Sequence, residues 1–76
     1  MEILQMHEWR THNNRQFSLV SYESRGAGWI AAVDIRASTK GMVTITPIHD
    51  ATRHFATEEE ANNAAVAMAI TWMNSN

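Results

Sequence analysis

The fold of this chain is decided by residues 29–48, which read WIAAVDIRASTKGMVTITPI. Residues 29–36 carry apolar side chains at every second position, which is the period of a β-strand with one buried face. Residues 42–48 repeat the alternation with β-branched side chains. Between them, residues 38–41 (STKG) place a glycine late in the loop, as is typical of hairpin turns. The stretch therefore predicts two antiparallel strands joined by a tight turn.

The same alternation predicts which face of the hairpin is buried. In the second strand we expect Val43 and Ile45 to face inward, with Thr44 and Thr46 facing outward. Pro47 cannot donate a ladder hydrogen bond, so this strand either lies at an edge or ends there. In the first strand the inward face carries Trp29, Ala31, Val33 and Ile35.

Two weaker strand patterns precede the hairpin. Residues 16–23 begin with Phe17 and Leu19 on one face and continue with Tyr22 on the other. This change of phase predicts either a bulge or a strand that is apolar on both faces. Residues 3–11 form a candidate N-terminal strand, although their alternation is poor.

A helix is predicted near the C-terminus. Thr57, followed three residues later by Glu60, forms a capping box, in which the Glu60 carboxylate returns to the amide of Thr57. The three glutamates of the first turn suit the positive end of the helix dipole. Residues 57–73 contain neither glycine nor proline and predict a continuous helix. The polar residues 49–56 are expected to form a connection.

These elements predict an α+β fold: an antiparallel sheet of three or four strands packed by one C-terminal helix. The order is β-β-β-α, with or without an extra N-terminal strand. We expect one domain over residues 1–76, with the sheet in residues 3–48 and the helix in residues 57–73, since the chain is too short for two domains. The predicted core consists of Trp29, Val33, Ile35, Val43, Ile45, Phe55, Ala61, Ala65, Met68 and Trp72.

The predicted helix has two apolar stripes, whereas a surface helix normally has one. The first stripe runs from Ala61 to Trp72, and the second lies roughly opposite it. Two arrangements would bury the second stripe: residues 3–11 fold across it, or a second copy covers it in a homodimer. The candidate protein interface is this second stripe, which consists of Val66, Ile70 and Met73.

Composition excludes several kinds of chemistry. The chain has no cysteine, and therefore no disulfide, thiolate metal site or cysteine nucleophile. His49 and His54 lack a third ligand at metal-binding spacing, and no serine lies in a GxSxG motif. We expect no catalytic, cofactor-binding or metal-binding residues and no enzymatic activity. The N-terminal residues lack a signal-peptide pattern and no window is long and apolar enough for a membrane span, so we expect a cytoplasmic protein.

The order of three strands and a C-terminal helix resembles the double-stranded-RNA-binding domain. That family's helix begins with lysines that bind phosphate, and this chain has Glu58, Glu59 and Glu60 there. The resemblance therefore implies a shared topology without the RNA contact.

A second resemblance is to HicB-like antitoxin domains. Residues 28–35 (GWIAAVDI) resemble that family's strand motif, and residues 57–61 (TEEEA), followed by further alanines, resemble its helix opening. Val33 stands where the family has proline, and about twenty residues separate the two motifs. Residues 55–61 also resemble short bacterial proteins with an FATxEEA helix opening, a likeness that implies a stand-alone domain and assigns no activity.

Together these features predict a non-enzymatic protein-interaction or regulatory module, antitoxin-like and homodimeric, with itself or another protein as partner. The alternative is a sheet that binds single-stranded nucleic acid through stacked aromatic rings and arginines. The net charge of −2 does not favour nucleic acid. For that alternative, the candidate contacts are Trp9, Arg10, Arg15, Tyr22, Arg25 and Arg36.

Overall fold

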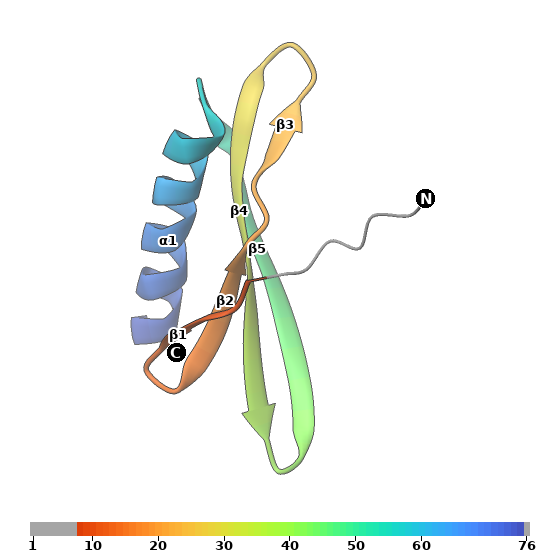
Figure 1. The fold of residues 1–76 in the computed structure, drawn as a ribbon, viewed down its shortest axis with the longest axis vertical. Coiled ribbons are helices and arrows are strands. Elements are labelled where there is room, and N and C mark those ends of the chain that lie inside the picture. Colours follow the sequence, from red (N-terminus) through yellow and green to blue (C-terminus); the bar gives the residue numbers. More distant parts are fainter. Residues whose placement is uncertain (1–7, 76) are drawn as a thin grey trace.

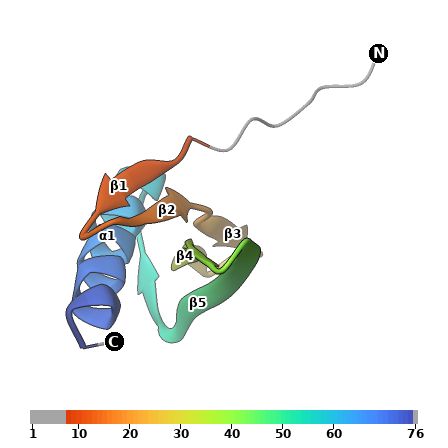
Figure 2. The same ribbon diagram turned by 90° about the horizontal axis from the view of Figure 1, so that it is seen from below.

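The computed structural model of this chain describes residues 8–75. It contains a five-stranded antiparallel sheet packed against one C-terminal helix, an arrangement that confirms the predicted α+β class (Figure 1). The helix crosses one face of the sheet, and β5 curls around β4 (Figure 2). The elements are β1 (Arg10–His12), β2 (Arg15–Leu19), β3 (Tyr22–Ser24), β4 (Gly28–Thr39), β5 (Met42–Phe55) and α1 (Glu58–Ser75).

Strand β4 is the centre of the sheet, with β2 and β3 on one edge and β5 on the other. β2 and β3 keep a single register along β4 and are interrupted only at Val20 and Ser21. There the hydroxyl of Ser21 accepts the amide hydrogen of Ala32, at 3.3 Å, in place of a backbone carbonyl. Of the two outcomes expected for residues 16–23, the segment that is apolar on both faces is therefore the one observed. Its pairing with β4 contains no bulge.

β5 is longer than the predicted strand 42–48. The prediction that residues 49–56 form a connection is wrong, because β5 continues through Pro47 to Phe55 and pairs with β4 along its length. Near its end the register shifts: Ala31 pairs with Asp50 but Trp29 pairs with Phe55, so one residue of β4 lies opposite four of β5. This bulge separates residues 51–54 from regular pairing, which is why they lacked a strand pattern.

Gly28 allows β4 to approach the end of β5 closely. Its φ is +95°, in the region that favours glycine, and a Cβ built there would lie 2.5 Å from the carbonyl oxygen of Phe55. Any side chain would therefore push apart the strand ends from which the chain enters α1.

The capping box closes the start of α1 with one difference from the prediction. The hydroxyl of Thr57 accepts the amide hydrogen of Glu60 at 3.2 Å. The Glu60 carboxylate accepts the amide hydrogen of Ala56, at 3.1 Å, one residue before the expected donor. The amide hydrogens of Ala56 and Glu60 are thus bonded at the start of the helix, which begins at Glu58.

The core lies between α1 and one face of the sheet. On the helix, the buried residues Ala61, Ala65, Ala69 and Met73 follow one line at four-residue spacing. Alanine side chains are short, so the helix axis can come close to the sheet at this line. The sheet contributes Phe17 of β2 and, from β4, Ala31, Val33 and Ile35, which are at most 2% exposed.

The predicted core is correct in β4 and in the helix. Val33, Ile35, Ala61 and Ala65 are buried, and the larger apolar residues Trp29, Phe55, Met68 and Trp72 pack, half-buried, around them.

The expectation that Val43 and Ile45 are core residues is wrong, because their side chains are 53% and 52% exposed. In the pairing register, Ser38 faces Val43 and Arg36 faces Ile45, whereas the core residue Ile35 faces Thr46. Because paired residues share a face, Val43 and Ile45 lie on the face opposite α1. The hairpin of β4 and β5 also projects past the end of α1 (Figure 1).

We predict that Val33→Asp unfolds the protein, since it places an unpaired charge at a fully buried position. The cost should approach the whole stability of a domain this small, about 5 kcal/mol. Val43→Asp makes the same change at an exposed site of the same hairpin and should cost about 1 kcal/mol or less. Thermal melting by circular dichroism compares the two, and equal melting temperatures would remove Val33 from the core.

Candidate interaction surfaces

The turn between β4 and β5 fixes which backbone groups of β5 face outward. Lys40 and Gly41 both have positive φ, of 52° and 81°, and Thr39 pairs with Met42. This is a two-residue hairpin loop of the type I′ kind, whose flanking residues form a hydrogen-bonded pair. Hydrogen-bonded and non-hydrogen-bonded pairs alternate from there, so even-numbered residues of β5 bond to β4.

The odd-numbered residues of β5 consequently direct their backbone N–H and C=O groups away from β4. We call these groups of Val43, Ile45, Pro47 and His49 the outer edge. Among residues 8–75, no strand other than β4 pairs with β5. Pro47, which has no N–H, stands at an outward position, so it removes no bond from the sheet and β5 runs through it. Of the two outcomes expected at Pro47, the edge strand is confirmed.

Exposed apolar side chains gather at the outer edge. Met42, Val43 and Ile45 are 71%, 53% and 52% exposed, and with Tyr22 they are the large exposed apolar residues of the described chain. Residues 41–49 carry no acidic or basic side chain apart from His49. Sequence reasoning missed this surface, because alternation along residues 42–48 does not show which set of side chains faces the helix. The two-residue Lys40-Gly41 loop and its register, which the structure supplies, decide that choice.

A groove of about 520 Å³ lies between α1 and the second half of β5. Its size falls within the range of small-ligand sites. Apolar groups form its walls, and the charged side chains of Asp50 and Arg53 lie toward β5. The apolar lining comes from Ala31, Ile48, Phe55, Ala64, Ala67, Met68 and Trp72, with Thr71 and Ser75 completing the helix side.

Asp50 organises the bulge beside this groove. Its carboxylate accepts hydrogen bonds from the hydroxyl and from the backbone N–H of Thr52. These bonds, the hydroxyl first, favour the ionised form and hold the pKa of Asp50 below its ordinary value of 3.8, with smaller help from the charges of Arg53 and His49. The turn at Asp50 and Thr52 thus starts the bulge that carries Arg53 next to the ring of Phe55, at 5.0 Å from the guanidinium carbon.

The predicted interface of Val66, Ile70 and Met73 is placed differently from the expected second stripe. Met73 is 4% exposed and belongs to the same core cluster as Ala61, so little of it remains for a partner to contact. Val66 is half-buried and packs against that cluster, and Ile70 is half-buried. The buried alanine line runs between the two predicted stripes, which therefore flank one wide apolar face. Residues 3–7 of the segment expected to cover it lie outside the described residues.

The candidate nucleic-acid contacts do not gather on one surface. Tyr22 pairs with Ile30 on the face opposite α1, and the Arg36 guanidinium carbon lies 5.7 Å from the centre of the Trp9 ring on that face.

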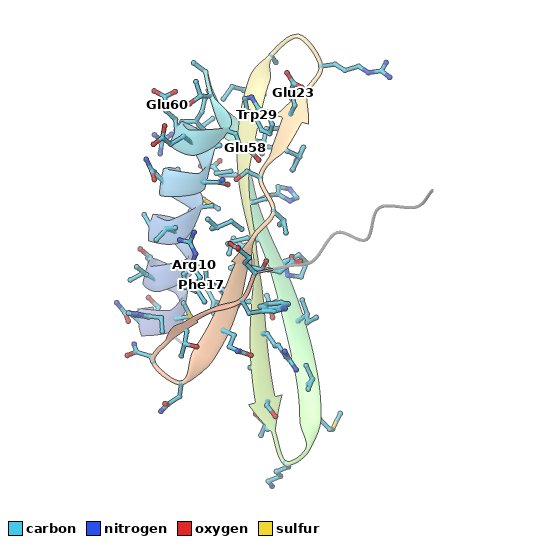
Figure 3. The ribbon with its side chains drawn as sticks, viewed as in Figure 1. Arg10, Phe17, Glu23, Trp29, Glu58 and Glu60 are labelled. Carbon is cyan, nitrogen blue, oxygen red and sulfur yellow. The ribbon has the colours of Figure 1, made fainter. Side chains whose placement is uncertain are left out.

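The three remaining arginines lie elsewhere. Arg10 pairs with Phe17 and lies beside it on the α1 side of the sheet (Figure 3). The Arg15 guanidinium carbon lies 5.7 Å from the centre of the Trp72 ring of α1. Arg25 is exposed in the turn between β3 and β4.

Searches against protein-family models, curated proteins and solved structures found no match to this chain. Within residues 8–75, no helix combines the length and the apolar character needed to cross a membrane. Residues 8–75 also bring together no group of three or more histidine, aspartate or glutamate side chains that could hold a metal ion. The surfaces above must therefore be interpreted from their own chemistry.

We predict that Thr52→Val raises the pKa of Asp50 toward 3.8, because the variant loses the hydroxyl bond that favours the carboxylate. Because the folded pKa is lowered, the stabilising effect of ionised Asp50 is complete well above 3.8 and is lost as the pH falls through the folded pKa. Carboxyl-carbon NMR titration measures the shift. Thr44→Val, on the same strand away from Asp50, should leave that pKa unchanged, and an unchanged value in Thr52→Val would contradict the prediction.

Proposed function

We propose that this chain is a non-enzymatic protein-interaction module that binds its partner by strand addition to the outer edge of β5. The observation that carries the proposal is the stretch 42–46, where outward backbone groups and exposed apolar side chains occur together. In strand addition the main-chain hydrogen bonds supply affinity and alternate side chains supply specificity. The outer edge offers both.

The distribution of protective features along β5 supports this proposal. Edge strands of soluble proteins are commonly protected by proline, by bulges or by charged side chains. β5 has Pro47 and the bulge at residues 51–54, and both follow Thr46. The first five residues of β5, from Met42 to Thr46, have none of these features and are rich in residues that favour strands. Because only residues 42–46 of the edge lack such protection, they can accept a partner strand of about that length.

The proposal includes an antitoxin-like or regulatory role as the general class of function. The residues that carry the resemblance to HicB-like domains have structural duties here: Gly28 allows the approach to Phe55, and Thr57 and Glu60 cap α1. They support a stable domain rather than a contact surface. The partner is therefore expected at β5, away from those motifs.

Affinity capture from the source cell tests the proposal. A tagged wild-type chain should retain a partner that is lost with Ile45→Lys, because the charge is placed on the edge a strand must cover. Asn63→Lys puts the same charge on the exposed side of α1, away from the groove, and should retain the partner. Identical sets of captured proteins for all three baits, by mass spectrometry, would reject the role of the outer edge.

The second candidate function is binding of single-stranded nucleic acid. It is supported by Trp9, Tyr22 and Arg36, which share the face opposite α1. Binding should quench tryptophan fluorescence when mixed-sequence oligonucleotides are added at low salt, because bases stack on aromatic rings. Arg36→Ala should weaken this quenching and Arg53→Ala, on the α1 side, should not. Unchanged fluorescence across sequences would end this alternative.

A further inference from the structure

We infer that the occupant of the outer edge is a second copy of this chain, paired antiparallel through residues 41–47 of both copies. This inference rests on the proposed function and names the partner. Antiparallel pairing of two identical edges produces a two-fold symmetric contact, in which each copy offers the same surface to the other. Such a contact requires that the edge be complementary to itself when reversed.

The backbone of β5 meets this requirement around Thr44. With the two-fold axis at Thr44, Val43 of each copy lies opposite Ile45 of the other, and both positions direct N–H and C=O groups outward. All four backbone groups of Val43 and Ile45 then find partners. An axis at Ile45 would place Pro47 opposite Val43, and an axis at Thr46 would place it opposite Ile45. In either case the carbonyl of the residue opposite Pro47 would lack a donor, because proline has no N–H. The axis at Thr44 instead sets Pro47 opposite Gly41, where the ladder ends.

The side chains of the same register match on both faces. On the face opposite α1, the exposed Val43 of one copy stacks on the exposed Ile45 of the other, in the kind of β-branched pair that stabilises sheets. On the other face, Thr44 meets its own copy and Met42 meets Thr46. These exposed apolar groups, which water surrounds in the single chain, would be partly buried.

Charge also permits this pairing. Residues 41–47 are uncharged, so the two-fold axis brings no like charges together. The turn of each copy lies beside Ile48 of the other β5, which places Lys40 two residues along the strand from the ionised Asp50 of that copy. The overlap ends where the turn of each copy meets Pro47 of the other, before the bulge at residues 51–54, so the contact is confined to the projecting hairpins. The bodies of the two copies then lie at opposite ends of the shared ladder.

Disulfide trapping tests the register directly, because the chain has no cysteine of its own. In the proposed pair, Thr44 faces Thr44 at a non-hydrogen-bonded position, with Cα atoms about 4.5 Å apart, a separation that a disulfide spans. Thr46 would lie about 13 Å from its own copy, four residues further along the strand, which is beyond disulfide reach. Under mild oxidation we expect Thr44→Cys to form a linked dimer of twice 8.6 kDa and Thr46→Cys to stay single.

Sedimentation of the unmodified chain supplies the second measurement. At about 100 µM, a concentration that populates micromolar complexes, we expect the wild-type chain and Asn63→Lys to sediment as dimers and Ile45→Lys as a monomer. A monomeric wild type, or linking of Thr46→Cys equal to that of Thr44→Cys, would overturn the inference. If the wild type is monomeric while capture through Ile45 succeeds, the edge serves a different protein and the proposed function stands. Failure of both experiments rejects both.

Discussion

The register between β4 and β5 is the constraint on which the rest of this structure depends. A two-residue turn with two positive φ values leaves no freedom to slide one strand against the other. It places Val33 and Ile35 of β4 on the same face as Thr46 and Ile48 of β5, and α1 packs on that face. A slip of one residue would exchange every side chain of β5 between the buried and the open face. The position of the core and the composition of the open edge are therefore two results of one turn.

The helix suits this sheet because its buried line is made of small side chains. Ala61, Ala65 and Ala69 bring α1 close to Ala31 and Val33, and larger residues on both sides of the line close the gap. The same geometry explains how a helix with two apolar stripes is accommodated without a second layer. A wide apolar face, rather than two opposite ones, needs only one sheet and the side chains that surround it. What remains partly open is the groove toward β5, where the bulge places Asp50 and Arg53.

These arrangements bring exposed apolar side chains and outward-facing backbone groups together at the end of the β4–β5 hairpin. A domain of this size buries a modest share of its apolar surface, so some must stay exposed. In this chain the exposed part is the end of the β4–β5 hairpin, where Met42, Val43 and Ile45 accompany open backbone groups. Pro47 and the bulge close the remainder of β5 to pairing. The chain thus combines a stable helix–sheet body with a short, uncharged pairing segment, which is the physical basis for the interaction role proposed above.

The sequence by itself determined the elements that depend on local chemistry: the strand at residues 29–36, the turn before Met42, the capping box at Thr57 and the helix that follows. It also identified Val33, Ile35, Ala61 and Ala65 as core, because alternation and helical spacing mark them independently of any partner strand.

Only the tertiary structure decided the orientation of Val43 and Ile45, the extension of β5 through residues 49–55, and the central place of the alanine line. Alternation shows that two sets of side chains face opposite ways but not which set meets the helix. The pairing with β4 makes that choice, and the bulge near Asp50 allows β5 to continue to Phe55. The packing of α1 on the sheet decides which line of the helix is buried. All three are properties of the assembled fold.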